Sequence, residues 1–139
     1  ERGDLTRRII GCFFETYKGL GHGFLESVYD GALAISLGNA GLSFVRQAPV
    51  DVWYRGHLVG EFKADFLVET AVILELKTAK CVDAAHMAPL LNCLTATRIE
   101  VGFLLNFGVC PQFRRVILSH RHRISARFCE NPRSDPAES

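Results

Sequence analysis

The stretch DFLVETAVILELK, residues 65–77, limits the possible folds more than any other part of the chain. It is apolar apart from a polar centre and three charges near its ends, a pattern typical of two buried strands joined by a tight turn. A turn over residues 69–71 makes the hairpin register symmetric about Thr70. Asp65 is then expected to face Glu75 across the two strands.

The two faces of this predicted hairpin differ in chemistry. Side chains two residues apart on a strand point to the same face, so Lys77 is expected to join Asp65 and Glu75. The opposite face of the second strand is wholly apolar: Val72, Leu74 and Leu76. We therefore expect three charges to converge on one patch, with an apolar face behind them that packs against a helix.

The remaining sequence predicts an α/β domain. Apolar residues recur at three- and four-residue intervals in three segments, which indicates amphipathic helices, and β-rich segments alternate with turn residues elsewhere. The expected elements are helices over residues 5–20, 24–38 and 83–97, strands over 43–54, 58–69 and 70–79, and strands over 99–108 and 114–120. We expect two N-terminal helices, a three-strand antiparallel meander, a helix and two further strands in a mixed sheet. One domain is expected over residues 1–128, followed by a flexible polar tail over 129–139.

The composition indicates a soluble cytoplasmic protein with one hydrophobic core. The chain has 139 residues, of which 48% are hydrophobic, enough for a single domain. No apolar run has the length of a membrane span, the first residues lack the apolar core of a signal peptide, and no membrane partner is expected. The five scattered cysteines form no disulfide framework or zinc motif. A net charge of +1 means that any basic surface must be local.

The clustered acids indicate metal chemistry. Two carboxylates this close repel each other in a low-dielectric environment unless a cation lies between them. Mg²⁺ and Mn²⁺ suit such hard oxygen ligands and keep other positions for water and substrate phosphate. Lys77 would orient the attacking water or neutralise charge on a phosphate. The set predicts phosphodiester hydrolysis; the alternative is a solvated ion-pair face on an ordinary hairpin.

A second motif carries a resemblance to a known family. The segment GHGFLESVYDGAL places Gly23, Glu26 and Tyr29 in the spacing GxxExxY. This spacing resembles the signature of the GxxExxY proteins, a branch of the PD-(D/E)xK nuclease superfamily. The similarity continues through VRQAPVDVWYRGHLVGEFKADFLVE, VILELKTA, GFLLNFG and RRVIL, and so spans about residues 5–118.

The resemblance implies a PD-(D/E)xK nuclease-like core and a catalytic set. By motif, Glu26, Asp65 and Glu75 would be ligands of Mg²⁺ or Mn²⁺, and Lys77 would be the catalytic lysine. All four would be catalytic residues of a hydrolase that cleaves DNA in preference to RNA. Nucleic acid is the partner implied, and a homo-oligomer is compatible with the family. A surface glutamate at a helix start is the alternative for Glu26.

Three positions depart from the family pattern. Pro89 and Cys93 stand where relatives carry a glutamine and a tyrosine, and Ser36 stands where they carry an acid. These departures leave open a catalytically impaired module that acts in oligomeric interaction or nucleic-acid binding. A small-molecule hydrolase has no supporting feature. Pro89 also predicts that its helix starts near Ala88 or is kinked, because proline disrupts a helix interior.

A basic segment near the end of the chain predicts phosphate contacts that read no bases. Its candidate nucleic-acid-binding residues are Arg114, Arg115, Arg121 and Arg123. The alternative is a charged edge strand that discourages aggregation. His86 is a candidate for substrate contact, with helix capping as the alternative.

Overall fold

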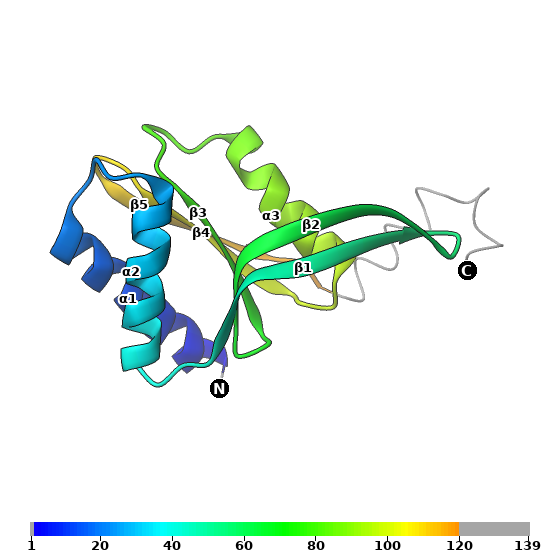
Figure 1. Cartoon of the computed structure of the whole chain (residues 1–139), viewed down its shortest axis with the longest axis horizontal. Helices are drawn as coiled ribbons and strands as arrows, with labels where there is room; N and C mark the ends of the chain where they lie inside the picture. The colour runs from blue at the N-terminus through cyan, green and yellow to red at the C-terminus, as the bar shows by residue number, and fades with distance from the viewer. Residues whose placement is uncertain (1, 120–139) are drawn as a thin grey trace.

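The computed structural model describes residues 2–119. The elements, in chain order, are α1 (Arg2–Leu20), α2 (Glu26–Asn39), β1 (Phe44–Tyr54), β2 (His57–Val68), β3 (Val72–Lys77), α3 (Ala84–Ala96), β4 (Val101–Phe107) and β5 (Pro111–Ile117) (Figure 1). This order confirms the predicted succession of helices and strands. None of the described helices is both long and apolar enough to cross a membrane. The predicted end of the domain at residue 128 and the tail lie outside the described residues.

The strands form one mixed sheet in the order β1-β2-β3-β4-β5. β1, β2 and β3 make the antiparallel meander, β3 pairs in parallel with β4, and β5 is antiparallel to β4. Parallel neighbours need a crossover connection, and α3 provides it. β5 begins at Pro111, earlier than predicted, because proline is tolerated at the first position of an edge strand.

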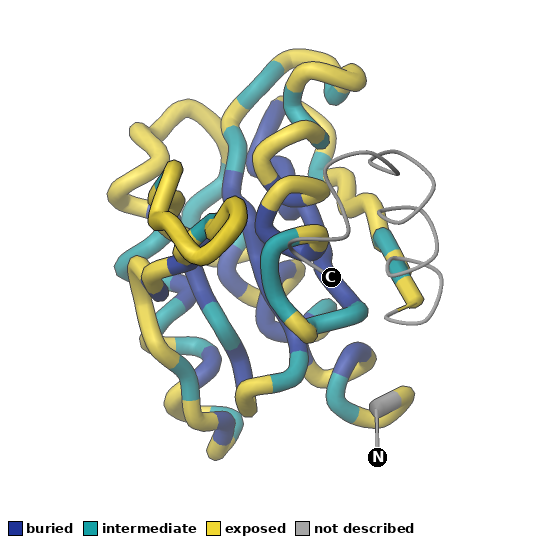
Figure 2. Tube along the Cα trace, turned by 90° about the vertical axis from the view of Figure 1, so that its right-hand side faces the viewer, coloured by how far each residue is buried: buried dark blue, intermediate teal, exposed yellow. Residues whose placement is uncertain are grey.

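Helices cover both faces of the sheet, with α1 and α2 on one side and α3 on the other (Figure 1). Phe13 of α1 and Leu33 of α2 belong to one core cluster, and Leu90 of α3 belongs to another, together with Ile73 of β3. The predicted apolar face lies in the α1–α2 cluster: Val72, Leu74 and Leu76. Figure 2 shows the buried residues concentrated in the middle of the molecule. By alternation, Glu75 shares the α3 side with Ile73.

The hairpin register between β2 and β3 is the one that the sequence predicts. Phe66 pairs with Leu74, and Val68 pairs with Val72, so the ladder is symmetric about Thr70. β2 continues beyond this ladder but pairs there with β1 alone. The β1–β2 hairpin therefore extends as an arm away from the three-layer body (Figure 1).

The start of α3 contradicts the first of the two forms predicted for this helix, and the kink at Pro89 stays a prediction. The helix begins at Ala84, not near Ala88, and Pro89 lies inside it. A capping box explains the early start: the Asp83 carboxylate accepts from the His86 N–H at 3.1 Å, and His86 Nδ1 accepts from the Asp83 N–H at 3.0 Å. Pro89 is exposed, so its missing N–H and the carbonyl it leaves without that bond lie near solvent. The structure gives His86 the capping role.

Candidate active site where two strands separate

The candidate site lies at the point where β2 leaves β3. The last paired rung is Phe66 with Leu74. One residue beyond it, Asp65 Oδ2 accepts a hydrogen bond from the backbone N–H of Leu76 at 2.8 Å. The carboxylate thus takes the place of the main-chain acceptor that a continued ladder would supply. This bond fixes the orientation of Asp65 against the end of β3.

The buried Glu75 side chain pairs with Asp65, which is half-buried. The exposed fraction of Glu75 is only 7%, and its carboxyl is hydrogen-bonded to the Asp65 side chain. Burial, followed by the negative charge of Asp65, raises the pKa of Glu75 from 4.5 to about 8, while the charge of Lys77 opposes the shift. Two carboxyls this close hold one proton between them more readily than two charges. In the protein without a bound cation, Glu75 is therefore mainly neutral at pH 7.

Lys77 ends β3 beside this pair. It is half-buried, and its positive charge lowers the pKa values of both Glu75 and Glu26. The segment after Lys77 is held by Asn106 of β4, which is fully buried. The Asn106 amide donates to the carbonyl of Ala79 at 2.9 Å and accepts from its N–H at 2.8 Å. Sequence reasoning missed Asn106; a single amide in the apolar segment GFLLNFG was the available signal.

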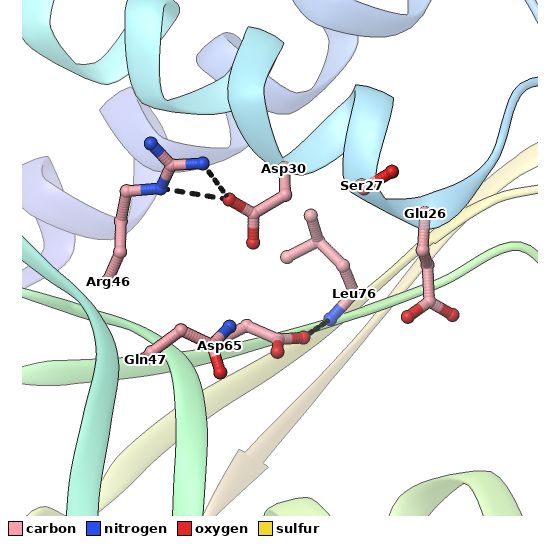
Figure 3. A pocket seen from close by; sticks show the side chains of 7 residues that line it. All are labelled: Glu26, Ser27, Asp30, Arg46, Gln47, Asp65 and Leu76. Carbon is pink, nitrogen blue, oxygen red and sulfur yellow. Dashed lines mark hydrogen bonds and ion pairs between the residues drawn. The ribbon is translucent and has the colours of Figure 1, made fainter.

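Glu26 approaches the pair from the other side of the divergence. It is the first residue of α2 and is exposed, and its side chain extends from the helix toward the strands (Figure 3). Partial desolvation is the main cause that raises the pKa of Glu26; the charge of Lys77 lowers it and that of Asp65 raises it. Glu26 therefore stands at the rim of the site, near Asp65 and Lys77, and outside the hydrogen-bonded pair of Asp65 and Glu75.

The other residues of the GxxExxY motif shape the loop that leads to Glu26. The Tyr29 hydroxyl donates to the carbonyl of Gly21 and accepts from the N–H of Phe24 at 3.3 Å. The Tyr29 ring stacks on Phe107 with centroids 4.4 Å apart. Gly23 has a φ of 109°, which side chains with a Cβ rarely adopt. The glycine and the tyrosine thus set the start of α2, where the glutamate stands.

A pocket of about 630 Å³ opens between α2 and the two separating strands (Figure 3). Its lining residues are Glu26, Ser27, Asp30, Arg46, Gln47, Asp65 and Leu76. Both Nε and Nη2 of Arg46 donate to Asp30 Oδ1, so the one cation of this lining is already engaged by an acid. The pocket is consequently acidic overall.

The donor set fits a hard divalent cation in part. Within residues 2–119, no three His, Cys, Asp or Glu side chains lie close enough together to hold a metal ion. The predicted set of Glu26, Asp65 and Glu75 is therefore not assembled as a metal cluster, because Glu26 stands at the rim of the pocket. The remaining pair still suits Mg²⁺, which is often held by one or two carboxylates plus water and substrate oxygens. Burial and then the negative charge of Asp65 raise the pKa of Glu75, and a cation bound between the two carboxylates would oppose both effects.

The residues that depart from the family pattern lie in three different settings. Cys93 of α3 is buried; burial, then the charges of Glu75 and Asp65, raises the pKa of its thiol to about 11. The thiol of Cys93 is therefore near enough to the two carboxyls to be affected by their charges, whereas Pro89 is exposed on the same helix. Ser36 accepts a hydrogen bond from the Thr16 hydroxyl at 3.1 Å, which is a contact between α2 and α1. Ser36 therefore stabilises the helix pair rather than the site.

The two described arginines of the basic segment, Arg114 and Arg115, lie on opposite faces of the sheet. Arg114 pairs with Leu104, which in turn pairs with Glu75, so Arg114 lies in the same row and on the same face as Glu75. The side chain of Arg115 points to the other face, because alternate residues of a strand do so. Both arginines are exposed. The other predicted members of the segment lie outside the described residues: Arg121 and Arg123.

Comparison with known proteins agrees with this architecture. The profile of the PD-(D/E)XK nuclease superfamily matches residues 3–116. The crystal structure of SSO0001 has a similar fold, with a TM-score of 0.51 at 15% sequence identity over 73% of this chain. The present chain covers 54% of SSO0001, about half its length. No curated protein matches the sequence. Since the profile spans most of the chain, the protein belongs to the PD-(D/E)XK nuclease superfamily.

Proposed function

We propose that this protein is a Mg²⁺- or Mn²⁺-dependent nuclease of the GxxExxY branch that hydrolyses phosphodiester bonds, in DNA in preference to RNA. One observation carries the proposal: the buried Glu75 carboxyl is hydrogen-bonded to the half-buried Asp65 carboxylate at the divergence of β2 and β3. A buried carboxyl beside a second carboxylate is an unfavourable arrangement for two negative charges in a protein that never binds a cation. Membership of a nuclease superfamily supplies the reaction class in which such a pair is used.

The side chains suggest a division of roles. Asp65 and Glu75 would hold the cation, and Glu26, which stands at the rim of the pocket, would have to move inward to complete its ligands. A divalent cation held there would lower the pKa of water and offset charge on the substrate phosphate. Glu75 would lose the proton on its carboxyl on holding the cation, because metal ligands must be ionised. The Lys77 ammonium would offset the negative charge that develops on the phosphate.

The contact with nucleic acid would extend beyond the reacting phosphate. Arg114 occupies the same row and face of the sheet as Glu75, two strands away. Its guanidinium would contact a neighbouring phosphate of the bound strand, which favours binding independent of base sequence. Arg115 would take no part in the same contact, since it belongs to the opposite face.

Cleavage by variants of the carboxyl pair and the lysine tests the proposal. Labelled single- and double-stranded DNA and RNA are incubated with Mn²⁺ and the wild-type protein, Glu75→Gln, Lys77→Met or Glu61→Gln. We expect both site variants to slow cleavage by about 100-fold or more, the size expected for losing one group that stabilises developing charge. Glu61, an exposed acid on the β1–β2 arm, provides the matched change away from the site.

Two results would contradict the nuclease proposal. The first is a wild-type protein that cleaves no substrate with Mn²⁺ or Mg²⁺. The second is a Glu75→Gln variant that cleaves as fast as Glu61→Gln, since the activity would then come from another site or from a contaminant.

A catalytically impaired nuclease-fold module is the second candidate. Cys93 near the two carboxyls and Pro89 on α3 favour it, because neither side chain can supply the hydrogen bonds of the glutamine and tyrosine that the resemblance to the GxxExxY proteins implies at these positions. This candidate predicts that the wild-type protein binds Mn²⁺ and nucleic acid without cleaving it. The same assay therefore separates the two, provided that binding is measured alongside cleavage.

A further inference from the structure

Gln47 of β1 has a backbone conformation that is unusual for a strand residue with a side chain. Its φ is 52°, in the left-handed region that glycine favours, although it lies inside β1. The rungs on either side are regular: Arg46 pairs with Phe66, and Ala48 pairs with Ala64. The interrupted rung between them is that of Gln47 and Asp65. The irregular residue is therefore the direct neighbour of the site aspartate.

The irregularity changes the face that β1 presents. Arg46 bonds to Asp30 of α2, on one side of the sheet, whereas Ala48, two residues later, packs in the cluster of α3 on the other side. Residues two apart in a regular strand share a face, so the chain must rotate between them. Gln47 absorbs this rotation. Its side chain consequently points into the pocket beside Asp65 (Figure 3).

The amide of Gln47 is available for a ligand. The side chain is exposed, it lines the pocket, and within residues 2–119 no hydrogen bond or ion pair engages it. A non-glycine residue in a sparsely populated backbone region often marks a position where function uses the side chain. Glycine would adopt the same backbone conformation without strain. The strained conformation therefore indicates that the side-chain amide has a function, since glycine would relieve the strain but has no side chain.

The chemistry of the pocket indicates what the amide would bind. Three acids line it, and Arg46 is engaged by one of them, so an entering phosphodiester meets few free donors. A glutamine amide carries two N–H donors and no charge. We propose that the Gln47 side chain binds the substrate by donating a hydrogen bond to a non-bridging oxygen of the phosphodiester held beside Asp65. This inference rests on the proposed nuclease function.

Four proteins test the role of Gln47: the wild type, Gln47→Gly, Gln47→Asn and Thr70→Gly. Thr70 has a φ of 49° in the β2–β3 turn, so its glycine variant relieves a similar strain outside the pocket. Four quantities are measured for each: Tm, the Kd for labelled DNA and RNA oligonucleotides with Ca²⁺ in place of Mn²⁺, and kcat and KM with Mn²⁺.

We expect both glycine variants to have an unchanged or higher Tm, by up to about 4 °C, because glycine relieves the positive φ. Only Gln47→Gly should bind DNA more weakly, by about 10-fold or more, the size of a hydrogen bond to a charged group. Gln47→Asn keeps an amide and tolerates positive φ, so it should recover part of the loss. The loss should appear in KM more than in kcat.

The outcomes separate the two proposals. If Gln47→Gly binds and cleaves as the wild type does, the role of Gln47 is wrong and the nuclease function stands. If Gln47→Gly is clearly less stable than the wild type, the residue is structural and the inference also fails. If the wild type neither binds nor cleaves DNA or RNA, both proposals are overturned. Weaker binding by Thr70→Gly as well would show that the effect is not specific to the pocket.

Discussion

Glu75 is a carboxyl group held in its neutral form at pH values where an ordinary glutamate is charged. Its burial and its hydrogen bond to Asp65 both favour the proton, and the nearby ammonium of Lys77 offsets them only in part. A cation would reverse this balance, because it interacts favourably with the ionised form alone. The raised pKa of Glu75 is therefore consistent with a site that binds a cation.

The stability of the cation-free protein should depend on pH through Glu75. A carboxyl whose pKa is raised in the folded state stabilises the fold fully below its unfolded pKa, and this contribution is lost as pH rises through the folded pKa, here about 8. In EDTA, the free energy of unfolding of the wild type should fall relative to Glu75→Gln by roughly 2–4 kcal/mol between pH 4.5 and 8. Denaturant unfolding at several pH values measures the difference.

Glu75→Gln serves as the control in that experiment because the amide keeps the shape of the side chain and does not titrate. A difference between the two proteins that stays constant with pH would contradict the raised pKa.

At the scale of elements, the start of α3 is determined by two local features that favour different positions, and the capping box is the stronger. Pro89 favours a late start for α3, yet the capping box of Asp83 and His86 closes the first turn of the helix at Ala84. The interior proline remains in the helix, with one backbone hydrogen bond fewer. α3 is therefore expected to be less stable than its length and cap would allow.

Replacing Pro89 tests this expectation and its link to activity. Pro89→Ala and Pro89→Gln should both raise the free energy of unfolding by about 1–3 kcal/mol, because each restores an N–H donor and removes the ring from an exposed helix. Denaturant unfolding gives this number. Only Pro89→Gln should also raise the cleavage rate with Mn²⁺, since it supplies the amide that the resemblance to the GxxExxY proteins implies at this position.

Pro89→Ala is the matched control, because it changes the helix without adding an amide. A fall in stability for both variants would mean that α3 needs the proline. Equal cleavage rates for both variants would show that an amide at position 89 does not contribute to the reaction.

At the scale of the molecule, the site exists only where three elements meet: the end of β3, the bend in β2 and the start of α2. The part that could be predicted from sequence lies within one hairpin, since the turn at Thr70 sets which residues of β2 and β3 are opposite. The position of Glu26 near Asp65 and Lys77 was predicted from the GxxExxY motif. Helical periodicity alone would not have predicted it, because periodicity does not determine how a helix lies over a sheet. Asn106 and the left-handed Gln47 escaped prediction, since their roles arise from contacts and backbone rotation that no local pattern encodes.

The separation of Arg114 from Arg115 follows the same reasoning. Two adjacent arginines make one basic segment in the sequence, but a strand sends them to opposite faces. Only the pairing of β5 with β4, and of β4 with β3, tells which of them shares a row with Glu75. The local sequence thus predicts a basic segment, and the pairing of the strands determines which of its arginines lies beside the candidate site.

Proton release on Mn²⁺ binding tests the central claim, that Asp65 and Glu75 form the cation site. Titration calorimetry at pH 7 in two buffers of different ionisation enthalpy gives the number of protons released. With the pKa of Glu75 at about 8, wild-type protein should release close to one proton for each Mn²⁺ bound. Glu75→Gln should bind more weakly and release almost none, while Glu61→Gln behaves as the wild type. Tight Mn²⁺ binding without proton release, or binding that Glu75→Gln leaves unchanged, would contradict the account.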